Sequence, residues 1–152
     1  LNFCINQLIE SFDVSQKDEV LSLKGFKINL SESELLIQDR VIALLDQQGF
    51  SSQNYLELGK SLSISSDEIK FIINISEKNQ KIIRLNENLL FTSCNFDKLV
   101  ENMKKYFQDN EKMTVSDFKN IANTSRKYAV PLLEYLDKKN ITYRKDNYRK
   151  LK

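Results

Sequence analysis

Apolar residues recur at helical spacing over most of the chain, and short β-prone stretches interrupt this pattern in three places. In residues 33–50, Leu35, Ile42 and Leu45 predict the buried face of an amphipathic helix, and Gly49 predicts its end. The same reasoning predicts further helices over residues 1–12, 52–62, 95–110 and 114–123.

Two more predicted helices, over 65–79 and 124–140, show the clearest periodicity. Their apolar positions are Ile69, Ile72, Ile73 and Ile75 in the first, and Tyr128, Leu132, Tyr135 and Leu136 in the second. Pro131 leaves the start of the second helix open, because a proline ring clashes with the preceding turn. Either this helix is kinked at Pro131, or it begins near Ala129.

Each β-prone stretch contains residues that favour a tight turn. The turns are predicted at Lys24–Gly25, at 86–88 and at Asp146–Asn147, because Gly, Asn and Asp tolerate left-handed backbone. They recur about every 60 residues, which predicts an internal repeat.

The order helix, strand, helix, helix, hairpin is that of a winged helix-turn-helix domain. The predicted fold class is therefore mainly α with small β-hairpins (α+β), arranged as tandem winged helices. The predicted boundaries are 1–31 for the end of a truncated copy, 32–92 for a complete copy and 93–152 for a second complete copy. The joints near 30–33 and 91–95 are expected to be short, because no Pro/Gly/Ser-rich linker separates the copies.

The composition argues against an enzyme. The 152 residues contain no histidine and two distant cysteines, Cys4 and Cys94, so a zinc site or a Ser-His catalytic system is not expected. No GxxxxGK[ST] phosphate-binding loop occurs, and we expect no cofactor. No apolar run approaches the ~20 residues of a membrane span. The chain starts at Leu1 without a methionine, which suggests a fragment of a longer protein.

Charge is distributed unevenly along the chain. The net charge is only +2, but residues 117–152 contain ten basic and four acidic side chains, a net of +6. The preceding 116 residues therefore carry −4. Such asymmetry favours a nucleic-acid contact near the C-terminus over a tail that only aids solubility.

A winged helix contacts nucleic acid mainly through the start of its third helix and through its hairpin. Both places are basic in the last copy, which predicts an RNA-binding set of Ser125, Arg126, Lys127, Tyr128, Arg144, Lys145, Tyr148, Arg149 and Lys150. Two members have an alternative interpretation: Ser125 as a helix cap and Tyr128 as a core residue. The copy at 32–92 has an acidic helix start, and its hairpin has Lys81 and Arg84 but also Glu87, with apolar residues in place of Arg149 and Lys150. This copy is therefore interpreted as a spacer.

Residues 113–151 also resemble the C-terminal winged-helix region of bacterial selenocysteine-specific elongation factors. The matching residues are Phe118–Lys119, Ser125 to Ala129, Pro131 to Asp137, Thr142, Arg144 and Arg149. In this family a GTPase part delivers selenocysteinyl-tRNA to the ribosome, and the last of four winged helices holds a hairpin in the selenoprotein mRNA.

The resemblance implies that this chain is the mRNA-binding part of such a factor. Its partners would be the selenoprotein mRNA hairpin, and the ribosome and selenocysteinyl-tRNA through the missing N-terminal part. The chain is expected to be a cytoplasmic monomer with no membrane contact. Two alternatives remain: a winged helix of a transcriptional regulator that binds duplex DNA, and a winged helix that binds only proteins.

Overall fold

The computed structural model describes residues 14–17, 20–23, 30–51, 53–86 and 89–152. The chain divides into two compact units, residues 1–31 and 32–152. In the first unit, β1 (Val14–Lys17) pairs antiparallel with β2 (Val20–Leu23). The predicted helix over 1–12 and the predicted turn at Lys24–Gly25 lie outside the described residues.

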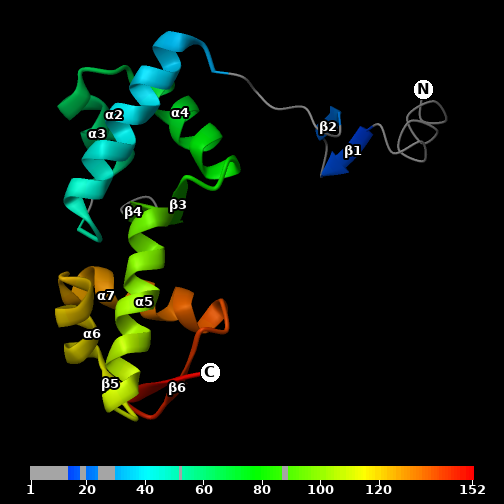
Figure 1. Ribbon diagram of the computed structural model, residues 1–152. Helices are drawn as coiled ribbons and strands as arrows, with labels where there is room; N and C mark the ends of the chain where they lie inside the picture. The colour runs from blue at the N-terminus through cyan, green and yellow to red at the C-terminus, as the bar shows by residue number, and fades with distance from the viewer. Residues whose placement is uncertain (1–13, 18–19, 24–29, 52, 87–88) are drawn as a thin grey trace. The chain divides into compact units, whose positions relative to one another are not determined.

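The second unit contains two successive sets of helices and strands (Figure 1). The first set is α2 (Glu32–Gln48), α3 (Tyr55–Leu62), α4 (Ser66–Lys78), β3 (Ile82–Asn86) and β4 (Leu89–Thr92). The second set is α5 (Ser93–Asp109), β5 (Met113–Thr114), α6 (Val115–Ala122), α7 (Arg126–Lys138), β6 (Thr142–Lys145) and β7 (Tyr148–Leu151). This order confirms the mainly helical winged-helix fold.

The internal repeat is confirmed by backbone conformation. Helices α3 and α6 have eight residues each, helices α4 and α7 have thirteen each, and each pair is offset by 60 residues. The left-handed residues that follow these helices are offset in the same way: φ is 57° at Ser63 and 46° at Asn123, and 58° at both Gln80 and Asn140.

The last set contains a three-stranded sheet in the order β5-β7-β6. Its hairpin turns at the predicted place, because Lys145 pairs with Tyr148 across the turn. The left-handed residue of this turn is Asp146, at φ 53°. In the first set β3 pairs antiparallel with β4, and residues 87–88 of the predicted turn lie outside the described residues.

The buried face of α2 differs from the prediction. Leu35 is 44% exposed, and the buried residues are Gln38, Val41 and Leu45. A glutamine is tolerated here because its polar atoms are satisfied: Gln38 Nε2 donates to Ser76 Oγ at 2.8 Å, and Lys81 Nζ donates to Gln38 Oε1 at 2.7 Å. Of the predicted positions, Leu45 is buried, Ile42 is half-buried and only Leu35 is wrong, because the prediction excluded a polar residue from the core.

Helix α7 begins at Arg126 and contains Pro131, so the alternative start near Ala129 is wrong. Proline has no N–H to donate to the Lys127 carbonyl, so this bond of the helix is absent. Leu132 and Leu136 are fully buried and hold the helix against the core despite that loss.

The joint between the two sets contains no linker residue. Strand β4 ends at Thr92 and α5 begins at Ser93. The Thr92 hydroxyl accepts a hydrogen bond from Asn95 N at 3.2 Å, as the N-cap of α5, and donates one to Asp46 Oδ1 of α2. A 3.3 Å bond from Asn95 Nδ2 to Asp46 O joins the same elements.

One hydrophobic cluster continues across this joint. Phe50, Leu89 and Phe91 of the first set pack in the same cluster as Leu99 and Leu132 of the second. The rings of Phe50 and Phe91 meet edge to face at 5.1 Å. Because the core is shared, residues 32–92 and 93–152 support each other's folding.

Helix α6 begins with a reciprocal cap that has a consequence for acid stability. The hydroxyl and N–H of Thr114 donate to Asp117 Oδ2 at 2.7 and 2.8 Å, which lowers the pKa of Asp117 below its ordinary 3.8. A carboxyl with a lowered pKa in the folded state stabilises the fold above its ordinary pKa, and this contribution is lost as pH falls through the folded value.

We therefore expect Asp117→Asn to lower the free energy of unfolding by about 0.5 kcal/mol at pH 7, a modest value because the group is partly exposed. The difference in the free energy of unfolding between the variant and the wild type should disappear below pH ~4. Urea unfolding followed by circular dichroism between pH 7 and pH 2 measures this difference. A difference that does not change with pH would contradict the stabilising role of the ionised Asp117.

Candidate nucleic-acid interface

The N-terminus of α7 is basic and has no side-chain cap. Its first two residues are Arg126 and Lys127, both exposed, and its first turn contains no acidic residue. Ser125 occupies the N-cap position, but its side chain makes no capping hydrogen bond. Its expected capping role is therefore absent, and the first N–H groups of α7 keep their tendency to bind an anion.

The repeat provides a direct comparison at α4. There the side chain of Ser65, the N-cap residue, accepts a hydrogen bond from Glu68 N at 3.3 Å. Asp67 and Glu68 make the first turn acidic. The two helices have the same length and the same place in the fold, but α4 repels anions at its N-terminus where α7 attracts them.

The hairpin of the last set presents a polar face to solvent. The strand register places Tyr143 opposite Lys150 and Lys145 opposite Tyr148, so these four side chains share one face. Tyr143 and Lys145 are exposed, whereas Tyr148 and Lys150 are half-buried. Lys112 Nζ lies 4.9 Å from the centroid of the Tyr148 ring. Two rings beside positive charges suit stacking of unpaired bases next to phosphates.

The opposite face of the hairpin contains Arg144 and Arg149, which pair across the strands. Arg144 is exposed, and its Nε donates to the Asp146 carbonyl at 3.1 Å, which orients the guanidinium near the turn. The other guanidinium nitrogens of Arg144 are the ones that would face a phosphate.

Arg149 was expected to bind RNA, but its side chain does not face the solvent. It is 6% exposed, and its Nε donates to Asp137 Oδ2 at 3.0 Å in an ion pair. Asp137 also accepts from Thr142 Oγ1 at 2.6 Å. Through these two bonds Asp137 fastens the hairpin to α7. We therefore assign Arg149 a structural role and leave it out of the proposed interface.

The Tyr128 side chain contacts the hydrophobic core on one side and the solvent on the other. It is half-buried and packs against the hydrophobic cluster, and Lys127 Nζ lies 5.3 Å from its ring centroid. Core packing accounts for its position in the apolar stripe, and its exposed edge holds Lys127 near the start of α7.

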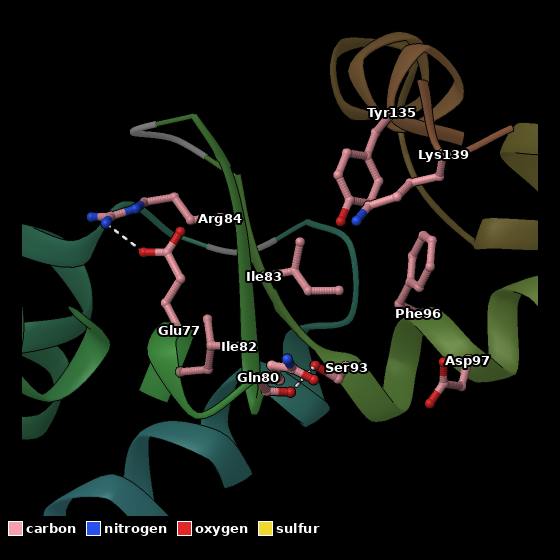
Figure 2. Close-up of a pocket in the computed structure, with 10 residues that line it drawn as sticks. All are labelled: Glu77, Gln80, Ile82, Ile83, Arg84, Ser93, Phe96, Asp97, Tyr135 and Lys139. Carbon is pink, nitrogen blue, oxygen red and sulfur yellow. Dashed lines mark hydrogen bonds and ion pairs between the residues drawn. The ribbon is translucent and has the colours of Figure 1, made fainter. Parts of the chain in front are cut away.

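A cleft of about 660 Å³ opens between β3, the start of α5 and the end of α7. Figure 2 shows Phe96 and Tyr135 on one side and Ile83 on the other, with the Glu77–Arg84 ion pair at its edge. Asp97 and Lys139 also line it. Because acidic and basic groups balance, this cleft offers a polyanion no net attraction.

Membrane-spanning helices and metal sites were both searched for in the described part of the chain. No helix there is long and apolar enough to cross a membrane. Among the same residues, no cluster of three or more cysteine and acidic side chains could hold a metal ion.

Comparisons with known proteins agree with the fold and with the resemblance found in the sequence. Residues 105–151 match the family model described as "Elongation factor SelB, winged helix". Over 152 residues, all of this chain, it is 21% identical to a selenocysteine-specific elongation factor from Desulfomicrobium baculatum, of which it covers 24%. The chain thus spans about a quarter of that curated relative.

Two solved structures show the same fold. One is the mRNA-binding domain of the elongation factor SelB from E. coli in complex with SECIS RNA: TM-score 0.65 and 18% identity, covering 81% of this chain and 99% of that one. The other is a bacterial selenocysteine-specific elongation factor: TM-score 0.61 and 24% identity, covering 99% of this chain and 23% of that one. The predicted resemblance to the C-terminal winged-helix region of this family is confirmed.

Proposed function

We propose that this chain binds a hairpin in an mRNA and belongs to a translation factor that inserts selenocysteine at UGA codons. The observation that carries the proposal is the contrast between α7 and α4. Arg126 and Lys127 occupy an uncapped helix start where the repeat has Ser66 and Asp67. The matched family model supports it, as does the RNA complex of the structural relative.

On this proposal the copy at 93–152 binds the RNA, the copy at 32–92 is a spacer, and residues 1–31 end a preceding winged helix. The interface consists of Ser125, Arg126, Lys127, Tyr128, Arg144, Lys145, Tyr148 and Lys150. Holding the hairpin near the UGA codon raises the local concentration of the tRNA that the factor delivers. The ribosome and selenocysteinyl-tRNA would bind the rest of the factor, which would act in the cytoplasm as a monomer and carry the GTPase activity that this chain lacks.

The test is a set of salt-titrated binding curves for residues 1–152. The ligands are a selenocysteine-insertion hairpin, the same stem with a scrambled loop, and a DNA duplex of equal length. We expect about a 100-fold preference for the authentic loop that persists as salt rises, since base contacts are less sensitive to salt than phosphate contacts.

Equal affinities that fall together with salt would reduce the interface to a nonspecific basic patch and contradict the proposal. Tighter binding to the DNA duplex would favour a transcriptional regulator. No binding to any of the three ligands would favour a winged helix that contacts only proteins.

A further inference from the structure

A second, smaller cleft lies at the joint between the two winged helices. Its volume is about 270 Å³, below the ~300–1,000 Å³ of pockets for small molecules. The end of α2 forms one wall, and α5 with the end of α6 forms the other. A space of this size is suited to part of one nucleotide rather than to a metabolite.

Polar groups dominate the lining of this cleft. Asn95, Lys98 and Asn102 follow one another at i, i+3 and i+7 on α5, so they share one face of the helix. Gln47 and Asn123 contribute further carboxamides from the facing wall and the end of α6. Carboxamides both donate and accept hydrogen bonds, as a ribose hydroxyl requires of its partner.

The lining carries one charge of each sign, Asp46 and Lys98, and the two groups differ in whether a partner already engages them. Asp46, the one acidic residue of the lining, already accepts a hydrogen bond from Thr92. In the described part of the chain, Lys98 Nζ and the Asn102 carboxamide form no hydrogen bond or ion pair, and both side chains are exposed. A positive amine beside an unengaged carboxamide matches a phosphate next to a 2′-hydroxyl.

The cleft lies within reach of the α7 N-terminus. Asn123 lines it, and Arg126 follows only three residues later, so the two are at most about 10 Å apart along the chain. Thr124 between them is fixed to the first winged helix, because its Oγ1 donates to the Phe50 carbonyl at 3.0 Å. The walls of the cleft are therefore held in place before any ligand binds.

From this arrangement we propose that the cleft binds the sugar–phosphate backbone of the same RNA strand that contacts Arg126, with a phosphate at Lys98 and a ribose 2′-hydroxyl at Asn102. The inference rests on the proposed function and extends the interface from the last winged helix across the joint to the end of α2. The cleft thereby distinguishes RNA from DNA, because only RNA supplies the 2′-hydroxyl.

The experiment compares hairpin binding by Lys98→Ala and Asn102→Ala with binding by two controls on the same helix. Lys104→Ala removes an exposed lysine, and Gln108→Ala an exposed amide, and neither lines the cleft. We expect Lys98→Ala to weaken binding roughly fivefold and to reduce the salt slope by about one. Asn102→Ala is expected to weaken binding roughly tenfold, and both controls to match the wild type.

A second measurement isolates the 2′-hydroxyl. Hairpins with a single 2′-deoxy nucleotide, moved one position at a time, are titrated against the wild type and Asn102→Ala. At one position the deoxy change should weaken binding to the wild type and leave binding to Asn102→Ala unaffected.

The inference is overturned if no such position exists, or if Lys104→Ala weakens binding as much as Lys98→Ala. If the wild type prefers the authentic hairpin and both cleft variants bind it as tightly as the wild type does, the cleft is not part of the interface and the proposed function stands. If the wild type does not prefer that hairpin, both the cleft inference and the proposed function are wrong. The binding curve of the wild type alone shows this. Circular dichroism melts confirm that each variant is folded.

Discussion

Replacing Arg126 and Lys127 together by alanine is expected to weaken binding of the authentic hairpin by about 2–4 kcal/mol, or roughly 30- to 1,000-fold. The loss combines an arginine that can bind bidentately with a lysine that acts as a point charge, both at a helix start that has no side-chain cap. Fluorescence anisotropy at several salt concentrations measures it, and the salt slope should fall by about two.

The repeat offers a matched control for this experiment. Ser66 and Asp67 occupy the same positions of α4, 60 residues earlier. Ser66→Ala with Asp67→Ala should leave hairpin affinity unchanged, because that helix start lies outside the proposed interface. Loss of binding in both double variants, or in neither, would show that α7 is not the contact.

Replacing Asp137 by alanine is expected to lower the free energy of unfolding by about 3 kcal/mol. The variant leaves the guanidinium of Arg149, whose side chain is only 7% exposed, without its 3.0 Å partner. It also removes the acceptor of the Thr142 hydroxyl, itself a buried residue. Urea denaturation followed by circular dichroism at pH 7 measures the effect.

Arg149→Met separates the two roles of that arginine. Because Met removes the charge but keeps much of the apolar length, we expect this variant to fold and to bind the hairpin within about threefold of the wild type. In the double variant with Asp137→Ala, much of the lost stability should return, since no buried charge remains unpaired. A folded Arg149→Met protein with hairpin affinity at least tenfold weaker would restore Arg149 to the interface.

The fold could be predicted from the sequence largely because of the repeat. Periodic isoleucines marked α4 correctly, and all four, at Ile69, Ile72, Ile73 and Ile75, are buried. The face of α2 could not be assigned in the same way, because Gln38 is buried through partners 38 and 43 residues away in the chain. Local periodicity contains no information about such distant hydrogen bonds.

The proposed interface was predictable only in part, for a related reason. Charge clusters identified Arg126, Lys127 and Arg144, which are all exposed. Arg149 has the same residue type and a similar setting in the sequence, and only the register of β6 and β7 shows that it faces α7. The cleft at the joint gave no signal, because Lys98 and Asn102 resemble ordinary solvent-facing positions until α2 and α5 are brought together.

The missing linker at Thr92 makes the length of the chain there as important as the identity of its residues. Each residue added to or removed from a helix start rotates the rest of that helix by about 100°. One inserted residue between Thr92 and Ser93 would turn Leu99 out of the shared core and the polar stripe of α5 away from its cleft, while every side chain stayed the same. Relatives that keep this arrangement should therefore tolerate substitutions around the joint and exclude insertions and deletions.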